Sequence, residues 1–297
     1  MACTVSIGLP VYNGADYLDG ALESILGQTY ADLEVVICDN ASTDATEEIC
    51  RRHAARDARV RYHRQPANQG AAKNYNDTFE LSSGRYFKWA AHDDLLEPGF
   101  VEACVTTLDA APESVVLAYP RAVVIDEDGE RLRVHEELMD IREQRPIQRL
   151  LHVVNRWGLC NPVFGLMRRD ALQSTGLIRP YVSSDVSLLA ELALLGEFWE
   201  IEDPLFLRRV HHHSSRGGHL SLTEVARWFD PNASGPRFLH PRTRLFFHVL
   251  SVVWRSPSPL GERIACVAAV TPAWWFRRLR IRQGQFRRWA WARLTRR

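Results

Sequence analysis

Short apolar runs alternate with longer stretches of helical pattern along the first hundred residues. The runs predicted to form buried strands lie at 4–9, 33–38, 60–63 and 86–91. Between the first two runs the apolar residues recur at helical spacing, as at Leu18, Leu22 and Ile25. Strand and helix therefore alternate about every thirty residues, which predicts an α/β fold with a mostly parallel sheet flanked by helices.

The fourth run ends in His92, Asp93 and Asp94, so two adjacent carboxylates stand where the strand leaves the sheet. The carboxyl edge of an open parallel sheet is where α/β folds bind ligands. Like charges held this close repel each other, and a divalent cation is the usual compensation. Carboxylate oxygens suit Mg²⁺ or Mn²⁺, which in turn bind diphosphates. For an isolated Asp-Asp pair a solvated acidic turn would be the better explanation, so the neighbouring motifs decide.

Three further polar motifs follow the other strands. They are Pro10-Val11-Tyr12-Asn13, Asp39-Asn40-Ala41-Ser42-Thr43-Asp44 and Asn68-x-Gly70-x-x-Lys73-Asn74. Together with 92–94, and in this order, they resemble the donor half of a family 2 glycosyltransferase of the GT-A fold. The resemblance covers residues 3–215 and implies a catalytic domain over 1–219, with a donor half to residue 95 and an acceptor half over 96–219. A helical region at 220–297 would follow it.

The resemblance implies donor-binding roles at the ends of the first strands. Pro10 and Tyr12 would border the nucleotide, with the Tyr12 ring against the base, and Asp39 would accept a hydrogen bond from a base N–H. The charge of Lys73 would suit the diphosphate. Each has a simpler alternative: Asp39 as a turn residue, and Lys73 as one of two lysines placed there by chance. Asp44 is assigned to helix capping.

The same resemblance implies a metal site. Asp94 would ligate Mn²⁺ or Mg²⁺, and Asp93 would face the ribose or a metal-bound water. The family commonly has Asp-x-Asp here, whereas this chain has Ala91-His92-Asp93-Asp94, so the division of labour between the two aspartates stays open. In the His triplet at 211–213, His211 fits the Arg-x-His segment of the family and is the expected ligand, with His213 in reserve. Neighbouring strand residues alternate faces, so all three cannot reach one ion.

The acceptor half carries the expected catalytic base. An apolar strand is expected at 163–167, and a helix follows with Leu188, Leu189 and Leu192 on its apolar side. Asp185 stands just before this helix, where the resemblance places a general base; an N-cap aspartate is the alternative. The implied reaction is a single displacement with inversion, in which Asp185 takes the proton of an acceptor hydroxyl.

Composition bears on the size of the core, on disulfides and zinc sites, and on the cellular location. The 297 residues are 46% hydrophobic, enough for a large core, and the six cysteines show no Cys-x-x-Cys pairing, so neither a disulfide framework nor a zinc site is expected. No signal peptide precedes the first strand, so the cytosol is the expected location. The acidic run 126–130 is interpreted as a hairpin turn between two strands.

Charge is distributed unevenly. Residues 237–297 contain 14 arginines and one acidic residue, and five of the nine tryptophans, whereas the first 236 residues carry a net charge of −12. Two helices are expected there, separated by Ser-Pro-Ser-Pro at 256–259, the second interrupted near Pro272. The apolar stretch 264–276 is too short to span a bilayer. Arginine with tryptophan suits an interfacial helix on an anionic membrane; packing on the acidic catalytic domain, or on a second subunit of a homo-oligomer, is the alternative. No nucleic-acid-binding motif accompanies the basic charge.

The substrates are less determined than the fold. UDP is the commonest nucleotide in the resembled family, with dTDP and GDP as alternatives, and a glycan, lipid-linked or small-molecule acceptor would fit, as in cell-envelope synthesis. A sugar nucleotidyltransferase is disfavoured because the loop at 10–14 lacks the glycine- and arginine-rich sequence expected there. A catalytically silent sugar-nucleotide-binding scaffold is disfavoured by the presence of Asp185.

Overall fold

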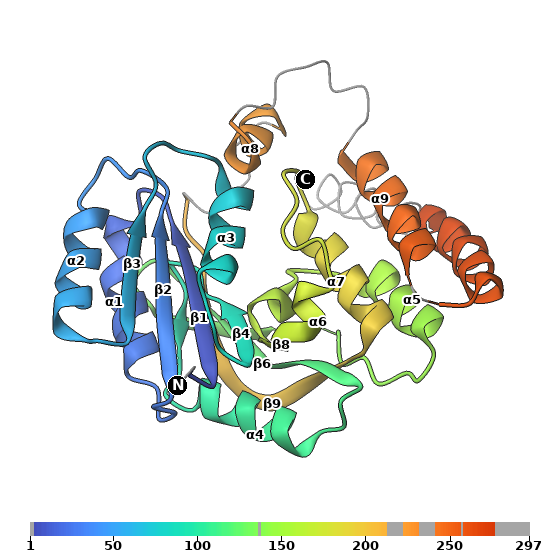
Figure 1. Cartoon of the computed structure of the whole chain (residues 1–297), viewed down its shortest axis with the longest axis horizontal. Coiled ribbons are helices and arrows are strands. Elements are labelled where there is room, and N and C mark those ends of the chain that lie inside the picture. The colour runs from blue at the N-terminus through green and yellow to red at the C-terminus, as the bar shows by residue number, and fades with distance from the viewer. Residues whose placement is uncertain (1–2, 136–137, 213–221, 232–240, 257, 277–297) are drawn as a thin grey trace, which may run out of the picture.

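A single mixed sheet runs through the centre of the protein. The computed structural model describes residues 3–135, 138–212, 222–231, 241–256 and 258–276. In these residues the sheet has nine strands, in the order β3-β2-β1-β4-β8-β6-β9-β5, with β7 paired to β6 (Figure 1). The strands are β1 (Val5–Val11), β2 (Leu33–Asp39), β3 (Val60–Arg64), β4 (Tyr86–Trp89), β5 (Leu95–Leu96), β6 (Val115–Ile125), β7 (Arg131–His135), β8 (Leu166–Arg168) and β9 (Glu197–Arg209).

Helices cover both faces of this sheet. They are α1 (Ala15–Leu26), α2 (Thr46–Arg56), α3 (Ala71–Glu80), α4 (Phe100–Ala110), α5 (Pro146–Arg156), α6 (Arg169–Gln173), α7 (Ser184–Leu195), α8 (Leu222–Phe229) and α9 (Pro241–Arg255), with a further helix over 260–276. The α/β alternation that the apolar pattern predicts is confirmed for the first four strands and the three helices between them.

The first four strands pair in parallel, which brings their carboxyl ends to one edge. β1 lies between β2 and β4, and β3 adds to β2, all in parallel register. Val11 is paired with Asp39, so the loops that follow β1 and β2 start side by side. This edge therefore collects the polar motifs at 10–13, 39–44 and 92–94, as the sequence predicts.

The second half of the sheet is mixed. β8 is antiparallel to both β4 and β6, while β9 is parallel to β6 and antiparallel to β5. The hairpin expected around residues 126–130 is confirmed, because β6 and β7 pair antiparallel across it. The long β9 ends at Arg209, next to the carboxyl edge of β4.

The strand expected at 163–167 is wrong in its first half. A 3₁₀ turn occupies Asn161–Phe164, and β8 begins only at Leu166. Pro162 fits the start of this turn because it has no N–H to donate, and the Gly165 N–H closes it on the Pro162 carbonyl at 2.9 Å. A methyl carbon on Gly165 would lie 2.7 Å from the Ala118 carbonyl oxygen, so only glycine lets the chain pass β6 here.

Two hydrophobic clusters fill the two faces of the sheet. Strand alternation separates them: Tyr86 of β4 belongs to the cluster under α1, α2 and α4, whereas Phe87 and Trp89 belong mainly to the cluster under α3, α5 and α7. Residues of α9 and of helix 260–276 join the second cluster, among them Val249 and Val270, both fully buried.

The C-terminal helices pack on the rest of the protein through α7. Glu191 of α7 is held 3.1 Å from His248 of α9, and the Arg244 guanidinium lies over the Tyr181 ring. The expected interruption near Pro272 is wrong, since helix 260–276 is continuous. Contacts on both sides of Pro272, by buried Cys266 and Val270 and by Trp274 against Phe246, hold this helix in place. No described helix is both long and apolar enough to cross a membrane.

Candidate functional site

A cavity of about 750 Å³ opens at the carboxyl edge of β1, β2 and β4. It draws residues from three parts of the chain that lie far apart in sequence. Among its lining residues are Pro10, Tyr12, Asn40, Asn68, Tyr75, Asp93, Asp94, Phe164, Arg208, His211, Arg227 and Trp228. The expected positions Pro10, Tyr12, Asp93, Asp94 and His211 are thus brought together around one cavity.

The acidic pair meets His211 inside this cavity. His211 Nε2 lies 2.9 Å from Asp93 Oδ2, and this hydrogen bond raises the pKa of His211 above its ordinary value. Burial alone would raise the pKa of Asp93, but the contacts with His211 and His92 more than offset it and lower the pKa. Burial and the neighbouring Asp93 charge raise the pKa of Asp94 to about 7. The described residues hold no ready-made cluster of three metal-ligating His, Cys, Asp or Glu side chains.

Arg209 fixes the end of β9 against the acidic strand end. Its backbone N–H donates to Asp94 Oδ1 at 2.8 Å, and its guanidinium donates to the carbonyls of Asp93, Asp126 and Glu127. The guanidinium also lies over the Tyr17 ring, 4.8 Å from the centroid. Because these contacts occupy most of the donors of Arg209, its main role is to position the site, whereas its neighbour Arg208 can present charge to the cavity.

Arg208 is a site residue that the sequence reasoning missed. Its guanidinium donates to the Leu159 carbonyl and to Asn161 Oδ1, and it lines the cavity beside Asp94 and Tyr75. The motif match favoured Arg209, since Arg209-Val210-His211 has the family spacing. Alternation of side chains along β9 would have been the signal that Arg208 and Arg209 point to different partners.

Asp185 lies near the cavity but not among the residues that line it. It is the second residue of α7; the N-cap is Ser183, so the alternative interpretation of Asp185 as an N-cap does not fit. One carboxylate oxygen accepts the N–H of Val186 at 2.9 Å. Burial, then the charges of Asp93 and Asp94 and, more weakly, that of Asp185, raise the pKa of the Tyr75 hydroxyl. Tyr75 therefore lies within electrostatic range of both the acidic pair and the expected base.

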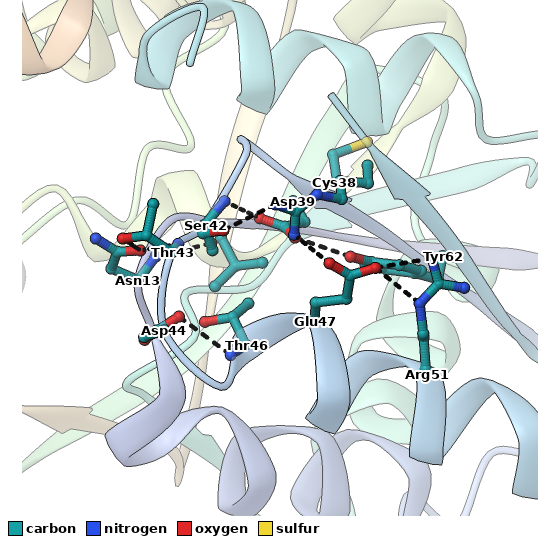
Figure 2. A network of polar contacts seen from close by, with 12 residues as sticks. Asn13, Cys38, Asp39, Ser42, Thr43, Asp44, Thr46, Glu47, Arg51 and Tyr62 are labelled. Atoms are coloured by element: carbon teal, nitrogen blue, oxygen red, sulfur yellow. Dashed lines mark hydrogen bonds and ion pairs between the residues drawn. The ribbon is translucent and has the colours of Figure 1, made fainter. Parts of the chain in front are cut away.

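Asp39 is fully buried and does not line the cavity. Its carboxylate accepts three hydrogen bonds: from the Ser42 N–H at 2.8 Å, the Tyr62 hydroxyl at 2.8 Å and Arg64 at 3.0 Å (Figure 2). The neighbouring Asn40 forms the cavity wall at this strand end instead. Contact of Asp39 with a base stays a prediction, and in this arrangement the base would have to reach it past Asn40.

The loop after β2 also occupies the N-terminus of α1. Successive backbone N–H groups of Asn13, Gly14 and Ala15 donate to the side chains of Ser42, Thr46 and Asp44, at 2.9 to 3.0 Å. The capping role expected for Asp44 is therefore confirmed, although it serves α1 as well as its own helix. Since three N–H groups at this helix end are already bonded to side chains, fewer donors are left there for a phosphate than helix N-termini often offer.

Lys73 is not among the residues that line the cavity. It forms an ion pair with Asp77, one helical turn further along α3, and its side chain is half exposed. The other lysine, Lys88, is fully buried in β4, where its ammonium donates to the Trp89 carbonyl at 3.0 Å. Contact of Lys73 with a diphosphate stays a prediction that this placement does not favour.

Comparison with known proteins assigns the chain to a family. The family model described as Glycosyl transferase family 2 matches residues 6–176, from β1 to just beyond α6. The chain belongs to this family. The resemblance seen in the strand-end motifs is thereby confirmed, and the family match includes the acidic pair but ends before Asp185, Arg208, His211 and α8.

Relatives of this family 2 chain agree with the assignment. An uncharacterized glycosyltransferase of Rickettsia typhi is 32% identical over 155 residues, which are 50% of this chain and 48% of that protein. Chondroitin synthase of Escherichia coli is 44% identical over 101 residues, 34% of this chain and 15% of that protein. The matched part thus spans about half or less of these relatives' own length.

Solved structures share the fold. TarS of S. aureus in complex with UDP-GlcNAc aligns with a TM-score of 0.65 and 13% identity, over 91% of this chain and 72% of that one. The mannosyltransferase PcManGT from Pyrobaculum calidifontis, in complex with GDP-Man and Mn²⁺, aligns with a TM-score of 0.54 and 18% identity, over 97% and 83%. The GT-A arrangement expected of a family 2 chain is therefore confirmed.

Proposed function

We propose that this protein is a metal-dependent, inverting glycosyltransferase that moves a sugar from a nucleoside diphosphate sugar to an acceptor hydroxyl. The observation that carries the proposal is the cavity at the sheet edge, which joins the family's strand-end motifs to Arg208 and His211 from the end of β9. The complexes of two fold relatives, one with UDP-GlcNAc and one with GDP-Man, support a nucleotide-sugar donor. UDP is the first candidate nucleotide.

A divalent cation fits the residues at the bottom of this cavity. Asp94 and His211 would hold Mn²⁺ or Mg²⁺, with Asp93 bonded to His211 beside them. Mg²⁺-type sites need only one or two protein carboxylates when phosphate oxygens and waters complete the shell. A bound cation would supply positive charge for the diphosphate. Such charge is needed because the N-terminus of α1, the other common phosphate site, is occupied by protein side chains.

The chain's own residues would perform the transfer as a single displacement. Asp185 takes the proton of the acceptor hydroxyl while that oxygen forms a bond to the anomeric carbon. The bond from this carbon to the diphosphate oxygen breaks, and the nucleoside diphosphate leaves with the electron pair. Arg208 contributes charge at the leaving group, and attack from the opposite face inverts the anomeric configuration.

Ligand binding is tested first, by thermal shift with UDP, GDP and dTDP, each with MnCl₂ or with EDTA. We expect one nucleotide to stabilise the protein clearly more than the others, and EDTA to reduce that shift, because a ligand that binds only the folded state raises its stability. No shift with any nucleotide would contradict the proposal. Binding without any turnover of the sugar donor would favour the silent scaffold.

The base assignment is tested with Asp185→Asn. We expect nucleotide affinity to stay within about twofold and release of nucleoside diphosphate from the donor to fall by at least about 100-fold, the usual contribution of a general base. Asp170→Asn is the matched control, because Asp170 also lies early in a helix and accepts the N–H of the following residue, at 2.8 Å. Full turnover by Asp185→Asn would refute the assignment.

We further propose that the C-terminal region contacts an anionic membrane surface and that the acceptor is a lipid-linked or cell-envelope glycan. The inner face of α9 packs on α7, whereas its outer face exposes Phe247 and Trp254, at 54% and 49% of their surface. These residues are seven apart, so they lie on one side of the helix. Helix 260–276 exposes Ile264 and Trp275 in the same way. Aromatic and aliphatic side chains on an arginine-rich segment are typical of an interfacial helix.

A further inference from the structure

One wall of the cavity comes from outside the part of the chain that matches the family. Glu224, Arg227 and Trp228 of α8 line the cavity, and their spacing of three and four residues places them on one face of the helix. Trp228 keeps 39% of its surface exposed, the same fraction as Tyr12 after β1. A large aromatic ring left half open inside a cavity is available to cover a flat ligand surface.

The position of α8 is fixed by a close backbone contact with the loop before α3. Gly70 has φ of +87°, and a methyl carbon added to it would lie 2.6 Å from the Phe229 carbonyl oxygen. The next residue of α8 after Trp228, Phe229, packs against the large hydrophobic cluster. The end of α8 thus packs closely against Gly70, which is part of the motif after β3. In this position the helix face with Glu224, Arg227 and Trp228 lines the cavity.

This contact places α8 at the end of the cavity where the first strands finish. Gly70 is held by Asn68, whose Oδ1 accepts the Gly70 N–H at 2.9 Å and a hydrogen bond from the Asn40 side chain at 2.9 Å. Asn40 and Asn68 line the same end of the cavity, next to the loop that carries Tyr12. The acidic pair and His211 mark the diphosphate end.

We infer that α8 covers the nucleoside of the donor, with the Trp228 ring as a stacking surface for the base and ribose in addition to Tyr12. The inference rests on the proposed function. It makes Trp228 a binding residue for the nucleoside, distinct from the residues that act on the diphosphate. Arg227, on the same helical face, adds a positive charge at the cavity rim.

The test is nucleotide affinity of the full chain, with whichever of UDP, GDP and dTDP binds wild type most tightly in MnCl₂. Trp228→Ala is expected to weaken binding about 5- to 100-fold, the range for loss of a base-stacking aromatic ring, and Trp228→Phe to restore most of it. The fold-loss should be the same for the matching nucleoside monophosphate, because the contact is with the nucleoside. Gly70→Ala, which displaces the end of α8, should weaken binding in the same direction.

Trp254→Ala is the matched control, since Trp254 is an exposed tryptophan on α9, and it should leave the affinity unchanged. If wild type binds a nucleotide and Trp228→Ala binds it equally well, the inference is wrong while the proposed function stands. Loss of affinity for the sugar nucleotide alone, with that for the diphosphate unchanged, would also overturn it, because Trp228 would then contact the sugar. If wild type binds no nucleotide, the proposed function fails and takes the inference with it.

Discussion

At the residue scale, Arg208 and Lys73 differ in what the positive charge of each already serves. Arg208 lines the cavity beside Asp94 and keeps guanidinium donors beyond those that bond Leu159 and Asn161. Lys73 is half exposed, and its ammonium is paired with Asp77. A diphosphate in the cavity would therefore meet Arg208, whereas contact with Lys73 would require this ion pair to open.

We expect Arg208→Gln to weaken binding of the nucleoside diphosphate about 10- to 100-fold, the loss typical of a charge-assisted hydrogen bond in a protected site. Lys73→Ala should change the affinity by less than about threefold, because Lys73 does not line the cavity and its ammonium is paired with Asp77. Isothermal titration with UDP and MnCl₂ measures both variants side by side. Equal losses in the two would show that Lys73 turns toward the phosphates, as the family resemblance implies.

Sequence reasoning places a site residue most directly where its position depends only on the end of its own strand. Tyr12, Asp93 and Asp94 follow directly from buried strands, so their place at the sheet edge depends only on where β1 and β4 end. Asp39 also follows a strand, but its orientation depends on Tyr62 and Arg64 of β3, which no local pattern shows. Tertiary partners, not strand position, decide which side chain of the 39–40 pair lines the cavity.

At the scale of elements, one buried carboxylate ties the amino ends of the parallel strands together. Glu34 of β2 accepts hydrogen bonds from Ser6 of β1 at 2.7 Å, from Ser83 before β4 at 2.7 Å and from Arg61 of β3 at 2.9 Å. Burial opposes the charge, but these hydrogen bonds prevail and lower the pKa of Glu34 to about 2. The network lies at the opposite edge from the cavity, so it concerns stability and not ligand binding.

We expect Glu34→Gln to lower the free energy of unfolding by about 1 to 3 kcal/mol at pH 7. A carboxylate whose pKa is lowered by folding stabilises the protein above its unfolded pKa, near 4.5, and loses this contribution as the pH falls toward 2. The difference between wild type and variant should therefore be full above pH 5 and shrink below it. Urea unfolding across this pH range, with exposed Glu113→Gln as the control, measures it; a constant difference would contradict the assignment.

The elements that the sequence predicted correctly are those with a regular pattern of apolar residues. The first four strands, the β6–β7 hairpin and α7 all show it, and all are present. The errors fall where proline and glycine act through tertiary contacts. Pro162 and Gly165 replace the start of an expected strand by a 3₁₀ turn against β6. Pro272, expected to interrupt a helix, is accommodated in a helix that is held on both sides of it, by buried Cys266 and Val270 before it and by the contact of Trp274 with Phe246 of α9 after it.

At the scale of the whole molecule, residues beyond the expected boundary at 219 contribute both to the cavity and to the hydrophobic core. α8, beyond that boundary, lines the cavity, and α9 buries Val249 and Leu245 in the cluster shared with α7. Sequence patterns could show that 237–297 is basic and rich in tryptophan. They could not show this packing, because the Gly70–Phe229 contact and the Glu191–His248 pair join residues far apart in the chain.

The two interpretations of the C-terminal region, packing on the catalytic half and contact with a membrane, thus apply to different faces of the same helices. The inner face is buried against α7. The outer face exposes Phe247, Trp254 and Trp275, each about half accessible. Transfer of such a side chain from water into an apolar phase is worth about 1.5 to 3 kcal/mol when burial is complete. Together with arginine charge, we expect three such side chains to support reversible binding to anionic lipid.

We therefore expect the full chain to float with vesicles of phosphatidylcholine and phosphatidylglycerol, and less with phosphatidylcholine alone. Replacing Phe247, Trp254 and Trp275 by serine should reduce the bound fraction at least about tenfold, since partial burial of three rings is lost. The matched control replaces Leu132 and Val134 of β7, exposed at 57% and 55%, by serine, and should float like wild type. All variants should keep nucleotide affinity, because none of these residues lines the cavity. The membrane proposal is wrong if wild type does not float. If, in addition, light scattering shows a dimer for wild type and for the β7 control but a monomer for the triple variant, the outer face is a subunit interface.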